Sequence, residues 1–315
     1  MDNFITQQAS AQVEADLCNS GWCCAERNES PGPKDWVTCE LSSGRGLIKA
    51  GIIAVVVVIR RPAGLWWILT ADVRSGKLSL VIRVEELSIT VGSFSLSKVG
   101  FEVDTGQYAI LMGRTGSGKT TILESVCGLK TISSGRIVLM DRDVTHLKPG
   151  LRDIGFVPQE GALFPTMTVR DQIGFALEIR KWKKSDIEQR VQELADLLGI
   201  EHLLKRKPLG LSGGERQRIA LGRALAAHPG VLCLDEPLSA LDEATRDEMY
   251  ALLKSVQQRT GVTTLHITHS RTEARLLADV VFRVEDGRVA QVDQETILDE
   301  PESPSSVSDL DRIEA

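Results

Sequence analysis

The sequence has little of several features that would point to other classes of protein. It has no excess of basic charge, because 37 Lys and Arg stand against 43 Asp and Glu for a formal net charge of −6. A nucleic-acid binder usually carries a basic face, so the composition predicts no nucleic-acid partner. The strongly apolar stretch 50–59 is bounded by Lys49 and Arg60, well short of the roughly 20 residues of a membrane-spanning helix. The six cysteines show no paired C-x-x-C spacing typical of zinc sites.

What is present divides the chain into three parts. An apolar content of 42% and a charged content of 25% are typical of a soluble protein with a sizeable core. Residues 1–80 hold four of the five tryptophans and no clear amphipathic period, which predicts a disordered N-terminal extension or a start assigned too far upstream. As an alternative, residues 50–59 and 65–69 could form a membrane-associating hairpin. Residues 299–315 are acidic and rich in Pro and Ser, which predicts a disordered tail.

A glycine-rich turn follows an apolar run and leads into a helical stretch at residues 113–121. Glycines at 113, 116 and 118 allow the backbone to turn its N–H groups inward, and the following helix adds the positive end of its dipole. The pattern predicts a phosphate-binding loop, in which Lys119 reaches the β- and γ-phosphates and the Thr120 hydroxyl binds Mg²⁺.

A second helix start carries the spacing of an anion site. Ser212, followed three residues later by Glu215, forms a capping box, so a helix should run from there to about Ala226. Gly213 and Gly214 leave the first amides uncovered and suited to an anion. A merely well-capped helix is the simpler interpretation.

Carboxylates follow a short apolar strand at residues 231–234. Asp235 would hold Mg²⁺ through its water shell, and Glu236 would orient or deprotonate an attacking water. An exposed turn is the simpler interpretation of this pair. His269 follows a later strand and would contact a γ-phosphate, although a lone histidine there is more often structural.

Six motifs in this order resemble an ABC-transporter ATPase over residues 81–298. They are the phosphate loop (Walker A), Gln159 (Q-loop), residues 211–218 (signature), 231–237 (Walker B), 239–242 (D-loop) and the switch histidine His269. The resemblance is greatest to the ATPase subunits of molybdate and tungstate importers. It implies an α/β fold: a P-loop NTPase core with an antiparallel β subdomain and an α-helical subdomain at about 160–210.

The resemblance also implies the residues of the site. Glu236, His269 and Gln159 would be catalytic, and Thr120, Gln159 and Asp235 would hold Mg²⁺. ATP would be bound by one loop and, in trans, by a second group of residues. The loop comprises Gly113, Arg114, Thr115, Gly116, Ser117, Gly118, Lys119, Thr120 and Thr121, and the second group comprises Ser212, Gly213, Gly214 and Asp242.

The resemblance implies a head-to-tail homodimer that works with two permease subunits and, indirectly, with a periplasmic or extracellular substrate-binding protein. Its place would be the cytoplasmic face of the cell membrane. The cargo could also be sulfate, ferric iron or a polyamine, and the chain could instead be a soluble ABC ATPase without a role in transport.

The sequence departs from the family pattern at three places. Arg114 replaces a usual proline and Ser270 a usual aspartate, but neither change removes a phosphate or metal contact. Val91 falls where an aromatic ring should stack on adenine, and Phe94 is the nearest ring.

Overall fold

The computed structural model describes residues 36–41, 44–49, 55–60, 66–71, 80–92 and 94–293. The chain divides into two compact units, Met1–Ser79 and Leu80–Ala315. Residues 294–315, and with them the predicted tail, lie outside the described residues.

The first unit contains two antiparallel hairpins in the stretch that the sequence predicts as an extension. Strand β1 (Trp36–Leu41) pairs with β2 (Gly44–Lys49), and β3 (Val55–Arg60) pairs with β4 (Trp66–Ala71). The segments of the membrane-associating hairpin therefore do pair, with Ile59 opposite Trp67. Their association with a membrane stays a prediction.

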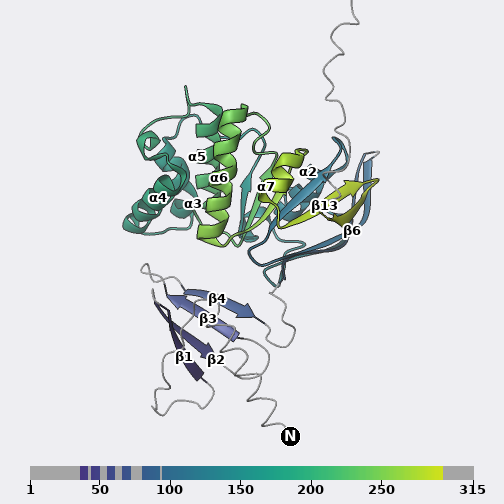
Figure 1. Ribbon diagram of the computed structural model, residues 1–315, viewed down its shortest axis with the longest axis horizontal. Coiled ribbons are helices and arrows are strands. Elements are labelled where there is room, and N and C mark those ends of the chain that lie inside the picture. Colours follow the sequence, from purple (N-terminus) through teal and green to yellow (C-terminus); the bar gives the residue numbers. More distant parts are fainter. Residues whose placement is uncertain are drawn as a thin grey trace, which may run out of the picture. The chain divides into compact units, whose positions relative to one another are not determined.

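A six-stranded sheet forms the centre of the second unit (Figure 1). Its strand order is β10-β11-β12-β7-β13-β14, and every neighbouring pair is parallel except β13 with β14. The strands are β10 (Ile154–Val157), β11 (Val231–Asp235), β12 (Thr263–Ile267), β7 (Tyr108–Gly113), β13 (Val280–Glu285) and β14 (Arg288–Val292). Because the carboxyl ends of parallel strands meet at one edge, the loops after β7, β10, β11 and β12 are brought together there.

Each face of this sheet is buried in its own core, as the alternation along β7 shows. Tyr108 and Ile110 point into a core built with the helical part of the chain, whereas Ala109 and Leu111 point into a second core. The first core includes residues of α3 (Val169–Ile179), α4 (Lys184–Leu198), α5 (Gly213–Leu225), α6 (Glu243–Thr260) and α7 (Arg271–Leu277). Short 3-10 turns occupy Pro149–Leu151 and Glu201–Leu203.

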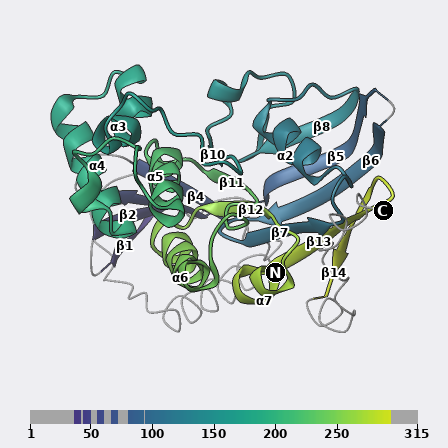
Figure 2. The ribbon, with the colours of Figure 1, turned by 90° about the horizontal axis from the view of Figure 1, so that it is seen from above.

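Helix α4 buries one apolar stripe, because Ile187, Val191, Leu194 and Leu198 all lie in the first core. The second core is built around α2 (Lys119–Cys127), whose apolar side chains pack between the central sheet and a second sheet. Figure 2 shows the helices α3 to α6 gathered on one side and α2 beside the strands β5 and β8.

The second sheet is antiparallel, with the order β6-β5-β8-β9. It comprises β6 (Phe94–Asp104), β5 (Leu80–Val91), β8 (Ser134–Leu139) and β9 (Arg142–Asp143). Strand β6 is continuous although its backbone is irregular in the middle. Lys98 takes a positive φ of 53° inside it, and the pairing with β5 shifts register nearby. An irregularity of this kind bends a strand without ending it.

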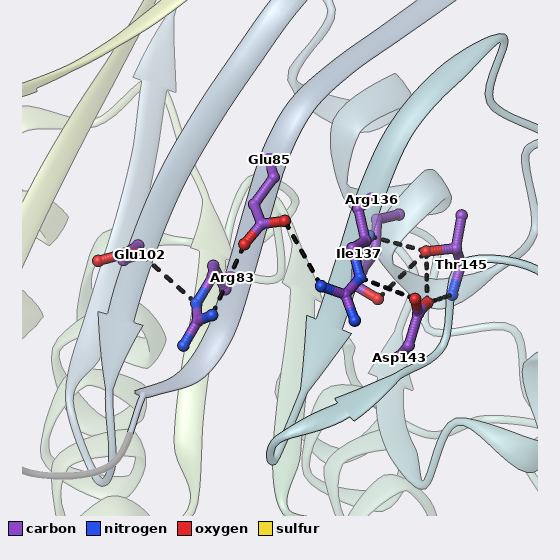
Figure 3. Close-up of polar contacts among 7 residues, drawn as sticks. All are labelled: Arg83, Glu85, Glu102, Arg136, Ile137, Asp143 and Thr145. Carbon is purple, nitrogen blue, oxygen red and sulfur yellow. Dashed lines mark hydrogen bonds and ion pairs between the residues drawn. The ribbon is translucent and has the colours of Figure 1, made fainter.

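Alternating charges cross the strands of the antiparallel sheet (Figure 3). Successive ion pairs run from β6 to β9 and join Glu102, Arg83, Glu85, Arg136 and Asp143 in that order. Hydrogen bonds from the hydroxyl of Thr145 and then from Arg136 lower the pKa of Asp143 well below its usual range. These side chains are partly solvated, so each pair contributes little to stability.

Candidate functional site

The glycine-rich loop joins β7 to α2, and close neighbours leave no room for a side chain at Gly113 or Gly118. Gly113, Gly116 and Gly118 have positive φ angles of 156°, 81° and 100°. A Cβ at Gly113 would lie 2.5 Å from the carbonyl oxygen of Val284, and one at Gly118 would lie 2.7 Å from Cζ of Phe94. Only glycine fits both positions, so the backbone amides can face a ligand that a side chain would obstruct.

Lys119 is the first residue of α2 and is held by the loop itself. Its Nζ donates to the carbonyl oxygens of Gly113 at 2.9 Å and Arg114 at 3.0 Å. An ammonium has three protons, so one donor remains for a phosphate oxygen. Burial lowers the pKa of Lys119, while the nearby charges of Glu236 and Asp235 oppose that shift.

The hydroxyl of Ser117 provides a test of whether the loop fits a ligand. Its Oγ is buried and has no hydrogen-bond partner among the residues that the structure describes. A buried hydroxyl without a partner is costly, and an anion in the loop would supply one. Arg114, Thr115 and Thr120 have exposed side chains on the same loop.

Asp235 ends β11 next to the start of α2. The Thr120 hydroxyl donates to its Oδ1 at 3.3 Å, and burial raises the pKa of Asp235. A hydroxyl and a carboxylate are oxygen ligands of the kind that Mg²⁺ prefers. Among the described residues there is no cluster of three or more His, Cys, Asp or Glu that could hold a metal, so this pair fits a metal shared with substrate phosphates.

Glu236 follows Asp235 in a strained backbone conformation, with φ of 42°. Its N–H donates to the carbonyl oxygen of Ile267 at 3.0 Å, which fixes the turn to the end of β12. His269 lies two residues beyond β12 and is 63% exposed, and its Nδ1 is 3.4 Å from Oε2 of Glu236. Strain of this kind concentrates at functional positions.

A small pocket adjoins the two side chains of Glu236 and His269. Leu238, Ser239, Arg246, Thr268, Ser270 and Glu273 complete its lining. The motifs of the sequence did not single out Arg246 or Glu273, and the only available signal was the capping-box spacing from Ser270 to Glu273.

The helix start at Ser212 is as predicted. Ser212 Oγ accepts from the N–H of Glu215 at 3.2 Å, and the Glu215 carboxylate accepts from the N–H of Ser212 at 2.7 Å. A Cβ on Gly214 would lie 2.6 Å from Cγ2 of Thr245 in α6. The glycine therefore lets the start of α5 pack against the start of α6, which Asp242 caps by accepting from the N–H of Thr245.

The structure thus brings the predicted residues together in two groups. One group comprises the phosphate loop, Asp235, Glu236 and His269. The other group comprises Ser212, Gly213, Gly214 and Asp242. The helices α2 and α5 that carry the two groups lie apart in both views, with strands of the central sheet between them (Figures 1 and 2). Gln159 is exposed in the turn after β10, the neighbour of β11.

The fold and the phosphate loop define a P-loop nucleotide-binding protein, and comparison with known proteins narrows the class. The family model described as ABC transporter matches residues 96–239. The chain belongs to this family, and the predicted fold class is confirmed.

Three similar proteins illustrate the family. The molybdate/tungstate import ATP-binding protein WtpC of Thermococcus kodakarensis is 46% identical over 213 residues, which are 68% of this chain and 64% of the relative. The sulfate/thiosulfate import ATP-binding protein CysA of Nocardia farcinica is 42% identical over 70% of this chain and 67% of its own length. A dimeric structure of a bacterial ABC transporter cassette superposes with a TM-score of 0.61 at 28% identity, covering 68% of this chain and 98% of that one.

Two further facts bear on how far the likeness extends. The chain matches about two thirds of the length of these import proteins. In the part of the chain that the structure describes, every helix is too short or too polar to cross a bilayer.

Proposed function

We propose that this chain binds and hydrolyses Mg-ATP as the ATP-binding subunit of an importer. The observation that carries the proposal is the meeting of Lys119, Thr120, Asp235, Glu236 and His269 at one edge of the central sheet. A phosphate loop, an oxygen pair for a metal and a carboxylate next to a histidine are the parts that phosphoryl transfer to water requires.

In this proposal the loop residues Gly113 to Thr121 surround the phosphates. Lys119 keeps its bonds to the loop carbonyls and directs its remaining proton to a phosphate oxygen. Ser117 gains the partner that its buried hydroxyl lacks among the described residues. Because the ammonium is already oriented, little reorganisation accompanies the build-up of charge on the transferred group.

Thr120 and Asp235 would hold Mg²⁺, with Gln159 joining them from the exposed turn after β10. The metal would supply neutralisation of phosphate charge when bound. Its charge would also favour the ionised form of Asp235, whose pKa is raised first by burial and then by the nearby charges of Glu236 and Glu124.

Glu236 would accept the proton of the attacking water. His269 would contact both the γ-phosphate and the Glu236 carboxylate and so keep the two groups in position. The contact of 3.4 Å between His269 Nδ1 and Glu236 Oε2 supports this division of roles. The backbone bond from Glu236 to Ile267 keeps the carboxylate at the end of the strand, where its position does not depend on a long flexible loop.

In a head-to-tail homodimer, the site of a second chain would be completed by Ser212, Gly213, Gly214 and Asp242. Ser212 is exposed, and the loop and the signature helix of one chain lie apart in both views (Figures 1 and 2). The solved relative is described as a dimer, which supports the same assembly here.

The importer would comprise two permease subunits and a substrate-binding protein outside the membrane, with this chain at the cytoplasmic face and no nucleic-acid partner. Residues 160–210 would dock a permease. Phe164 on this segment is 40% exposed and is supported by Phe175 and by the Arg223 guanidinium 5.2 Å from its ring centre. An exposed aromatic with such support is a typical anchor at an interface.

For the cargo we propose molybdate or tungstate, because the relative named for their import is 46% identical. Sulfate is the second candidate, because the relative named for sulfate and thiosulfate import is 42% identical. These three cargoes are tetrahedral oxyanions, whereas ferric iron and polyamines, the remaining candidates, are cations.

Two experiments test these proposals. Purified full-length chain should release phosphate from ATP only when Mg²⁺ is present, and a chain without such activity would refute the enzymatic proposal.

A deletion strain should lose uptake of molybdate and tungstate. Normal uptake of both, with loss of sulfate, iron or polyamine uptake, would reassign the cargo.

A further inference from the structure

Three buried polar side chains from separate elements meet beneath the pocket that adjoins Glu236. Tyr108 of β7, His266 of β12 and Glu273 of α7 are 1%, 0% and 4% exposed. The Tyr108 hydroxyl is 2.9 Å from His266 Nδ1, and His266 Nε2 is 3.2 Å from Glu273 Oε2. Glu273 also lines the pocket together with Glu236 and His269.

The protons of this trio can be assigned so that each contact joins a donor to an acceptor. Among the described residues neither His266 Nε2 nor Glu273 Oε2 has a hydrogen-bond partner, and these two atoms lie 3.2 Å apart. With the proton on Nε2, the imidazole places it beside the carboxylate and leaves Nδ1 free to accept from the Tyr108 hydroxyl. The imidazole thus has one hydrogen bond, at 2.9 Å to Tyr108, and one close polar contact, at 3.2 Å to Glu273.

Comparison with α5 shows that Glu273 is not simply a helix cap. Both helices begin with serine and carry glutamate three residues later, and in α5 the carboxylate of Glu215 returns to the N–H of Ser212. In α7 the N–H of Ser270 donates instead to Thr268 Oγ1 at 3.0 Å, while Glu273 turns into the interior toward His266. Burial of a carboxylate costs far more than a solvated cap, which argues for a role besides helix stability.

The contact between His266 and Glu273 closes the turn that carries His269. His266 precedes that turn and Glu273 follows it, and within it the Ser270 hydroxyl accepts from the N–H of Glu273 at 3.3 Å. His269 itself is largely exposed, so its own side chain has little packing to hold it. The base of the turn must therefore fix its position.

We propose that His266 and Glu273 are positioning residues that hold His269 in place against Glu236. This inference rests on the proposed ATPase function. Neither residue contacts the reacting atoms, and both act through the backbone of the turn. Tyr108 contributes by fixing the orientation of the His266 ring through the contact of 2.9 Å to Nδ1.

A double-mutant cycle tests the proposal on the full-length chain. Glu273→Gln keeps the size of the side chain but removes its charge, and we expect it to lower kcat by about tenfold with the KM for ATP unchanged. In a His269→Ala background the same change should alter kcat by less than about twofold, because residues that act as a unit are not additive. Glu86→Gln, on an exposed surface pair with Lys98, is the matched control and should behave as wild type.

Each outcome bears on one proposal. Equal losses from Glu273→Gln in both backgrounds would mean general damage to the fold and would overturn the positioning role. Wild-type kcat for Glu273→Gln would overturn it as well. A wild-type chain without Mg-dependent ATPase activity would instead refute the proposed function, and the positioning role would fall with it.

Discussion

Replacing Glu236 by Gln should separate ATP binding from ATP hydrolysis. The amide has the same shape as the carboxylate, and the bonds that hold the turn use backbone atoms: Glu236 N–H to Ile267 O, and Ser239 to Glu236 O. Stability should therefore change by less than about 0.5 kcal/mol. The lost group is the proton acceptor, and removal of a general base costs about 10²–10⁴-fold in kcat, or about 3–5 kcal/mol in the barrier.

The assay combines phosphate release at saturating ATP with size-exclusion chromatography in Mg-ATP. Glu236→Gln should bind ATP normally and accumulate as an ATP-bound dimer because turnover no longer separates the chains. Lys119→Ala, which loses the ammonium held at 2.9 Å and 3.0 Å by the loop carbonyls, should bind nucleotide weakly and dimerise poorly. A Glu236→Gln chain that hydrolyses ATP at the wild-type rate would refute the role of this carboxylate and point to His269.

Three further predictions concern the fold. In urea unfolding, Gly214→Ala should destabilise the chain by about 1–3 kcal/mol, because the added Cβ would lie 2.6 Å from Thr245. Gly150→Ala is the control and should leave stability unchanged, because a Cβ at Gly150 would have no atom within 4 Å. Equal effects of the two substitutions would contradict the packing argument. Deletion of residues 1–79 should leave ATPase activity and dimerisation intact, because the second unit begins at Leu80, and loss of turnover in a folded truncation would contradict this. The pKa of Asp143 is lowered by its hydroxyl and guanidinium partners, so the small stability deficit of Asp143→Asn should be present at pH 7 and shrink as the pH falls below about 4; a deficit that does not change with pH would exclude this linkage.

The phosphate loop and the start of α5 could be read from the sequence because both depend on local geometry. Positive φ angles at Gly113, Gly116 and Gly118 and a cap three residues from its partner are properties of adjacent residues. The proximity of Thr120 and Asp235 could also be anticipated. Asp235 ends β11 and Thr120 lies beyond the end of β7, and the carboxyl ends of these parallel strands share an edge of the sheet, so topology brings the two residues together.

The irregular features could not be read in the same way. A bend within β6 depends on its pairing with β5, and pairing between strands leaves no signature in either one. The sequence likewise cannot reveal that Gly214 serves the contact between α5 and α6, besides the anion site proposed for it, since that contact joins residues 31 positions apart, from Gly214 to Thr245.

The trio of Tyr108, His266 and Glu273 marks the limit of prediction most clearly. In the sequence, His266 is a polar residue in a buried strand and Glu273 has the spacing of a helix cap, so each has an ordinary local explanation. Only the docking of α7 against the central sheet turns the carboxylate inward, to within 3.2 Å of the imidazole. Two residues with ordinary local roles therefore become, through tertiary contact, the pair that closes the turn of His269, and a motif search that stops at His269 passes over both.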